Sequence, residues 1–162
     1  RAPARGAVAA ELAQRLAESH EETSLYRDPD LAPTRQPARV PATLQSFAAA
    51  SVRALLDDSR EIAAALGESL SETKSGVAFE APTRKRRGGA VALDRRTRMV
   101  YDAHHVFING DSYRASGADA RLMRRLANER ELDAREVRGA SAPARALLAQ
   151  WHAAGWLHAG RR

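Results

Sequence analysis

Residues 104–114 read HHVFINGDSYR and carry the clearest fold signal in the chain. The dipeptide Asn109-Gly110 tolerates positive φ at both positions, which suits a two-residue turn between antiparallel strands. The stretch therefore predicts a β-hairpin, and two further short β-like runs precede it at 90–93 and 98–101.

Two helices are predicted after this hairpin. Apolar residues recur at helical spacing over 117–130, and a second helix starts at Ser141 and stops at Gly155. The apolar face of the first helix is formed by Ala118, Leu122, Met123 and Leu126. Short strands, a hairpin and two helices in about 80 residues predict a small α+β domain of winged-helix type.

Residues 1–80 follow a helical pattern instead. Apolar residues every four positions between Val8 and Leu16 predict a short helix, and prolines every four residues over 28–41 predict an extended connector. Two more helices follow, and their apolar stripes consist of Leu44, Phe47, Leu55, Ile62, Leu66 and Leu70. Because three short helices enclose little volume, we expect these stripes to form a homodimer interface or to pack on a neighbouring domain.

The predicted organisation therefore has three segments. Residues 1–41 form a helix and a Pro-rich connector, residues 42–80 a helical dimerisation region, and residues 81–162 the winged-helix-like domain. A polar, basic, glycine-ended stretch at 82–89 marks the last boundary.

Charge differs between the halves of the chain. Residues 1–80 carry nine Arg or Lys and twelve Asp or Glu, whereas residues 81–162 carry seventeen and eight. The second half could thus meet a polyanion, with Arg121, Arg124 and Arg125 on one helix face as candidate contacts. A solvated basic face is the alternative, and the preference for Arg over Lys is also what a GC-rich genome produces.

Composition limits the function classes. The 162 residues include no cysteine, which excludes disulfides and thiolate chemistry. No run approaches the ~18 apolar residues of a membrane span, so we expect a soluble, cytoplasmic protein with no membrane partner. The chain begins at Arg1, and we expect it to be a piece of a larger protein.

No catalytic motif is recognisable in the sequence. His20 and Glu22, with a later His104 or His105, have the residue types of a two-His, one-carboxylate Fe(II) site. These residues fall in different predicted segments, so surface and strand-packing histidines are the preferred interpretation. We expect no catalytic, cofactor-binding or metal-binding residue in this chain.

Four segments together resemble a known family. They are Arg1-Ala2-Pro3, LYRDPDLAPT at 25–34, ESLSETK at 68–74 and FINGD at 107–111. They are similar to the C-terminal part of the bacterial cupin-superfamily, JmjC-type ribosomal oxygenases, arginine hydroxylases that act on a large-subunit ribosomal protein.

The resemblance implies a parent enzyme that uses Fe(II) and 2-oxoglutarate. In that family the Arg-Ala-Pro stretch leaves a double-stranded β-helix core, a helical segment dimerises, and a winged-helix-like domain follows. The family's His-x-Asp and distal His belong to the core, which would lie before Arg1, so none of these ligands is assigned here.

Two functions from different classes follow. The leading hypothesis is a dimerisation and substrate-supporting region of a ribosomal protein hydroxylase that is inactive on its own. The alternative is a winged-helix module that binds DNA or rRNA through the 117–130 helix. That face offers Asn128 but no second base-reading amide, so we expect any nucleic-acid binding to be weak.

Overall fold

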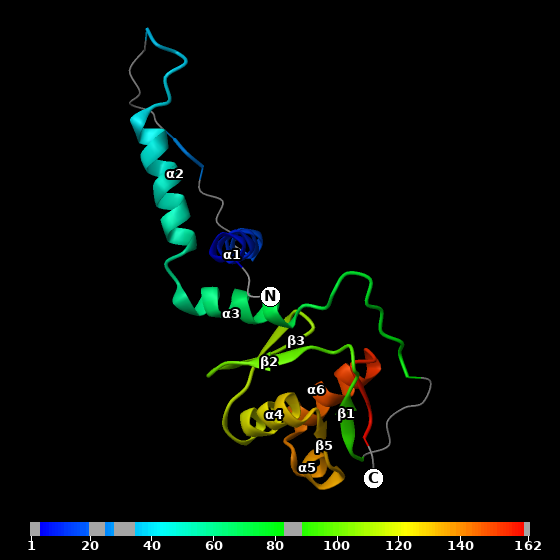
Figure 1. Cartoon of the computed structure of the whole chain (residues 1–162). Helices are drawn as coiled ribbons and strands as arrows, with labels where there is room; N and C mark the ends of the chain where they lie inside the picture. The colour runs from blue at the N-terminus through cyan, green and yellow to red at the C-terminus, as the bar shows by residue number, and fades with distance from the viewer. Residues whose placement is uncertain (1–3, 20–24, 28–34, 83–88, 161–162) are drawn as a thin grey trace. The chain divides into compact units, whose positions relative to one another are not determined.

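The computed structural model describes residues 4–19, 25–27, 35–82 and 89–160 (Figure 1). The chain separates into two compact units, residues 1–65 and 66–162. Helix α3 (Ser59–Ser71) begins in the first unit and ends in the second. Asp58 precedes this helix and accepts a hydrogen bond from the Arg60 backbone N–H at 2.7 Å, which satisfies a donor of the first turn.

The first unit is helical. It contains α1 (Arg5–Ser19) and α2 (Ala42–Leu55), which confirms the helices predicted at both places. The Tyr26 ring lies 5.4 Å from the Phe47 ring, and the Tyr26 and Thr43 hydroxyls are 2.7 Å apart. These contacts hold the segment around Tyr26 against α2.

The predicted hairpin is confirmed in the second unit. Strands β3 (His105–Ile108) and β4 (Asp111–Arg114) are antiparallel, with Ile108 opposite Asp111 across the turn. Asn109 and Gly110 both have positive φ, at 51° and 97°, as the two-residue turn requires. β2 (Met99–Tyr101) pairs with the other edge of β3 and completes a three-stranded sheet.

A second three-stranded sheet has the order β5-β1-β6. The central strand β1 (Val91–Leu93) is antiparallel to both β5 (Glu131–Leu132) and β6 (Leu157–Ala159). In Figure 1 this green strand accordingly lies among elements coloured orange and red.

Three helices complete the second unit: α4 (Gly117–Glu129), α5 (Ala134–Gly139) and α6 (Ala142–Ala153). The core that they form with the sheets consists of Val91, Leu93, Met99, Val106, Ile108, Met123, Leu126, Leu132, Val137, Ala140, Ala144, Leu148, Trp151 and Leu157. The predicted core face of α4 was partly wrong. Ala118 is exposed and Leu122 only half-buried, because the helix turns Ala120, Met123 and Leu126 inward.

The connectivity of this winged helix is circularly permuted. In the usual order, a helix, a strand and two further helices are followed by two strands that a hairpin wing connects, the last strand lying in the sheet centre. Here α4, β5, α5, α6 and β6 follow that order, but the central strand β1 precedes them all. The ends of β6 and β1 meet through the Gly160 N–H and the Ala90 carbonyl at 2.8 Å, and no hairpin connects these two strands.

In the part of the chain that the structure describes, none of the helices has the length and apolar character of a membrane span.

Candidate functional site: the apolar helices, the basic helix and the Asp94 junction

The predicted dimer residues lie on two helices with different surroundings. On α2, Leu44 and Phe47 are 37% and 36% exposed, and on α3 Leu66 and Leu70 are 39% and 50% exposed. Leu55 and Ile62 are half-buried. Four of the six side chains thus remain available to a partner.

Sequence reasoning missed further apolar positions on and beside α2. Val52 is 58% exposed and Leu56 is 45% exposed. The spacing Leu44, Ala48, Val52, Leu56 is the signal that could have found them, because these residues follow one another at four-residue intervals on the helix. The apolar surface of α2 is therefore wider than the predicted stripe.

None of the 14 residues of α2 is buried. A helix of this length is marginal in water on its own, because helices in proteins gain most of their stability from packing an apolar face. α2 therefore has the character of an element that is completed by another surface.

The basic helix face is largely occupied by contacts within the chain. Arg124 donates to the Asp102 and Ala103 carbonyls at 3.2 and 2.9 Å, and its guanidinium lies 5.6 Å from the Tyr101 ring centroid. Arg121 is exposed and makes no side-chain hydrogen bond or ion pair with the described residues. Of the three predicted polyanion contacts, Arg121 is thus the most accessible.

Arg125 is neutralised locally. It forms ion pairs with Glu129 at 3.0 Å and Glu136 at 2.8 Å. The Glu129 side chain beside it raises the pKa of Arg125.

The topology places α6, and not the predicted helix α4, where the DNA-reading helix of this fold would lie. α5 and α6 form the helix-turn-helix, and its second helix is the one that enters a groove in DNA-binding members of this fold. Apart from Arg145, the exposed residues of α6 are uncharged: Ala142, Pro143, Ala146, Ala149, Gln150 and Ala153. Arg145 on this helix donates to the Arg138 and Ala140 carbonyls at 3.3 and 2.7 Å.

We expect the chain to bind short DNA or rRNA duplexes weakly, with an affinity that falls steeply as salt rises. Each lost phosphate contact flattens the slope of log affinity against log salt by about 0.9 for B-DNA. Because Arg124 and Arg125 are engaged, the Arg121→Ala variant and the triple Arg121/Arg124/Arg125→Ala variant should flatten the slope equally. Affinity that survives physiological salt, with a preference of ~10³ for one sequence, would contradict this expectation.

Of the candidate Fe(II) ligands, only His104 and His105 lie among the described residues. His104 is exposed, and His105 Nδ1 lies 3.4 Å from Asp102 Oδ2. Burial alone would raise the pKa of Asp102, but the backbone N–H groups of His104 and His105 outweigh it and lower that pKa. His20 and Glu22 lie outside the described residues. Among those described, no three His, Asp or Glu side chains lie close enough to hold a metal ion.

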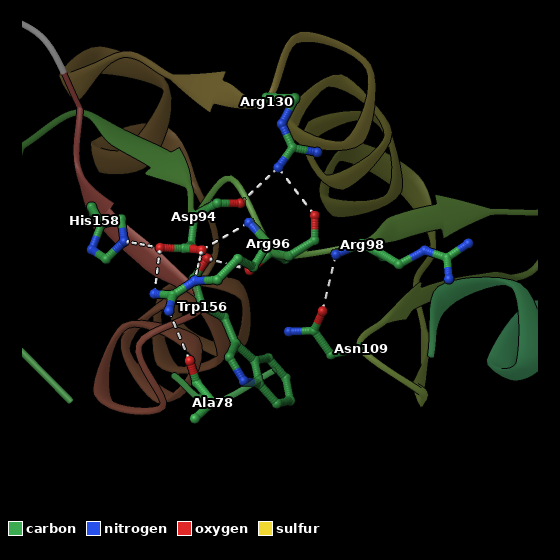
Figure 2. Close-up of polar contacts among 9 residues, drawn as sticks. Ala78, Asp94, Arg96, Arg98, Asn109, Arg130, Trp156 and His158 are labelled. Carbon is green, nitrogen blue, oxygen red and sulfur yellow. Dashed lines mark hydrogen bonds and ion pairs between the residues drawn. The ribbon is translucent and has the colours of Figure 1, made fainter. Parts of the chain in front are cut away.

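A cluster of polar contacts surrounds Asp94, in the connection between β1 and β2 (Figure 2). Asp94 is only 7% exposed. Its carboxylate accepts hydrogen bonds from the Arg96 backbone N–H at 2.8 Å and side-chain Nε at 2.9 Å, and it lies 2.6 Å from His158 Nε2. The Arg96 guanidinium holds the pKa of Asp94 well below its usual range.

The same cluster connects distant segments of the second unit. Arg96 Nη1 donates to the Ala78 carbonyl at 2.8 Å, and Arg130 donates to the Asp94 and Thr97 carbonyls at 2.7 and 3.1 Å. Thr97 Oγ1 donates to the Trp156 carbonyl at 3.0 Å. The oxygens of Asp94 are taken up by hydrogen bonds to Arg96 and the contact with His158, so the cluster acts as a structural junction. Sequence reasoning did not identify it.

Comparison with known proteins agrees with this architecture. A family model described as "ROXA-like winged helix" matches residues 54–158. No curated protein matches the chain.

Solved structures of Escherichia coli YcfD share the fold at a TM-score of 0.75 and 18% identity. One is described as a ribosomal oxygenase in complex with cobalt and succinic acid, and another as the same protein with cobalt and 2-oxoglutarate. The match covers 98% of this chain and 45%, 47% and 46% of the three YcfD chains. This chain therefore spans less than half the length of the structures that it resembles.

Proposed function

Because this chain belongs to the ROXA-like winged-helix family, we propose that it is the C-terminal dimerisation and substrate-supporting region of a ribosomal protein hydroxylase. Solved proteins of the same fold are described as ribosomal oxygenases, and this chain matches under half of each. In this proposal the partners are a second copy of the chain and a ribosomal protein, and the protein acts in the cytoplasm.

The dimerisation role rests on one observation about α2: none of its residues is buried, although it presents the apolar side chains Leu44, Phe47 and Val52. Burial of such side chains against a second copy stabilises an association at about 25 cal/mol per Å² of apolar area. Residues 42–80 form the association surface in this proposal, and residues 81–162 support the face that meets the ribosomal protein.

Fe(II) and 2-oxoglutarate belong to the parent enzyme in this proposal. The described residues offer no set of ligands for the metal ion. Catalysis is therefore assigned to a cupin core outside these 162 residues, and the chain alone is inactive.

The direct test is the mass of the chain in solution. Light scattering at micromolar concentrations should give roughly twice 17.6 kDa. A monomeric mass that persists at the highest attainable concentration would rule out dimerisation.

A further inference from the structure

The second half of α3 is attached to the winged-helix unit by polar contacts. Ser71 is fully buried, and its Oγ accepts the Gly110 backbone N–H at 3.1 Å while donating to the Glu68 carbonyl at 3.1 Å. Ser112 Oγ donates to the Glu68 carboxylate at 2.6 Å. The β3–β4 hairpin thus forms hydrogen bonds with the last turn of α3 at Glu68 and Ser71.

Close packing and a helix-end contact add to this attachment. Phe107 of β3 is 1% exposed, and its ring approaches Gly67 so closely that a Cβ at this position would lie 2.3 Å from ring atoms. Arg98 donates to the Glu72 carbonyl at 2.8 Å, which satisfies an acceptor just beyond the helix end. The face of α3 that carries Gly67 and Ser71 is therefore fixed by the winged-helix unit.

Leu66 and Leu70 lie on another face of the same two turns. They are 39% and 50% exposed and follow Ile62 at four-residue spacing. On α3, the positions nearest this stripe at 100° per residue are Ser59, Ala63 and Ser69, none of them charged. We call this face of α3 the arc: its centre is the apolar stripe of Ile62, Leu66 and Leu70, and the residues at its edges are uncharged.

We propose that the β3–β4 hairpin positions the Leu66 and Leu70 stripe as part of the dimer surface, so that dimerisation and the fold of the winged-helix unit are coupled. The proposal rests on the dimerisation proposed above. It adds Gly67, Ser71 and Phe107 as positioning residues that do not themselves touch the partner chain.

A second copy of this chain is the occupant that the stripe suits. Two identical neutral arcs can face each other about a two-fold axis without bringing like charges together. A charged partner would instead leave its charges opposite Leu66 and Leu70 with no counter-charge on the arc.

The proposed coupling between the hairpin and the dimer acts in both directions. If the hairpin holds the stripe in its binding geometry, loosening the hairpin weakens the dimer, and dimerisation in turn stabilises the hairpin. The melting temperature of the winged-helix unit must then rise with protein concentration.

The experiment follows melting of the full 162-residue chain by tryptophan fluorescence over a wide concentration range. Both tryptophans, Trp151 and Trp156, lie in the second unit and report its unfolding. We expect the wild-type melting temperature to rise with concentration. The Leu66→Asp variant should lose both the dimer and this dependence.

Ser71→Ala should weaken the dimer by about tenfold or more, measured by sedimentation equilibrium. Its matched control is Ser19→Ala, because Ser19 Oγ makes the same kind of bond to the Leu16 carbonyl at 3.1 Å at the end of α1. The control removes a helix-end bond without touching the hairpin and should leave the dimer affinity unchanged.

The two proposals fail in different ways. A wild-type chain that stays monomeric overturns dimerisation, and the coupling with it. A chain that dimerises while its tryptophan-reported melting temperature is independent of concentration overturns the coupling alone. The concentration dependence needs no variant, so it decides the question even if Ser71→Ala does not fold.

Discussion

Replacing Phe47 by Asp is expected to convert the dimer into a monomer of 17.6 kDa. A carboxylate that lacks a partner in an apolar interface costs several kcal/mol, which lowers the association constant by more than about a hundredfold. Light scattering or sedimentation on wild type and variant at equal concentration measures the change.

Phe47 also contacts Tyr26 within its own chain, so a second variant separates folding from association. Val52→Asp introduces the same charge on α2 at a side chain that is 58% exposed, and it should likewise give a monomer. Ser46→Asp lies on the opposite side of the helix and should leave the dimer intact. A Phe47→Asp chain that remains dimeric would remove α2 from the interface.

Asp94→Asn should clearly destabilise the winged-helix unit. The amide cannot carry the charge that faces Arg96 and His158, which lie 2.9 and 2.6 Å from the carboxylate. Both partners are about half exposed, so we expect about 2 to 3 kcal/mol rather than the larger cost of a fully buried pair. The melting midpoint should fall by roughly 10 °C.

The direction in which the stability contributed by Asp94 changes with pH follows from its pKa. Since the folded protein lowers the pKa of Asp94 from its usual 3.8, the carboxylate contributes its full stability above about pH 4. Below that pH the contribution shrinks, because folding must then release a proton from Asp94.

Thermal melts from neutral to acidic pH should therefore show the gap between wild type and Asp94→Asn narrowing below about pH 4. Asp111→Asn is the control, since Asp111 is exposed and, among the described residues, its carboxylate accepts a hydrogen bond only from the Tyr113 hydroxyl, at 3.2 Å. A gap that stays constant down to the most acidic pH would show that the ion pairs of Asp94 do not stabilise the fold.

Local signals in the sequence were sufficient to predict the hairpin and most helices. Asn109-Gly110 predicts its turn because few dipeptides accept positive φ twice, and the structure has both residues there. The capping box of Asp133 and Glu136 could likewise have revealed α5, which was not predicted. The buried residues in that region are Leu132, Val137 and Ala140, which are too few to show a helical period.

Contacts between distant segments could not be predicted in this way. The Asp94 junction depends on a pairing that brings His158 beside Asp94, and the sequence carries no local sign of it. The contacts of Arg124 and Arg125 could not be predicted from the sequence either. Helical spacing places them on a face, but only the fold shows that Asp102, Ala103, Glu129 and Glu136 engage them.

The permuted order of the sheet has a consequence for folding during synthesis. β1 leaves the ribosome before both of its neighbours, and Leu93 must wait for Leu157 to be translated before it can pair. Local elements such as the β3–β4 hairpin can form as soon as they emerge, whereas pairing across so long a separation is slow. We therefore expect the nascent chain to carry a central strand whose second edge stays unpaired until β6 is made, whereas in the usual order the central strand is itself the last to be synthesised.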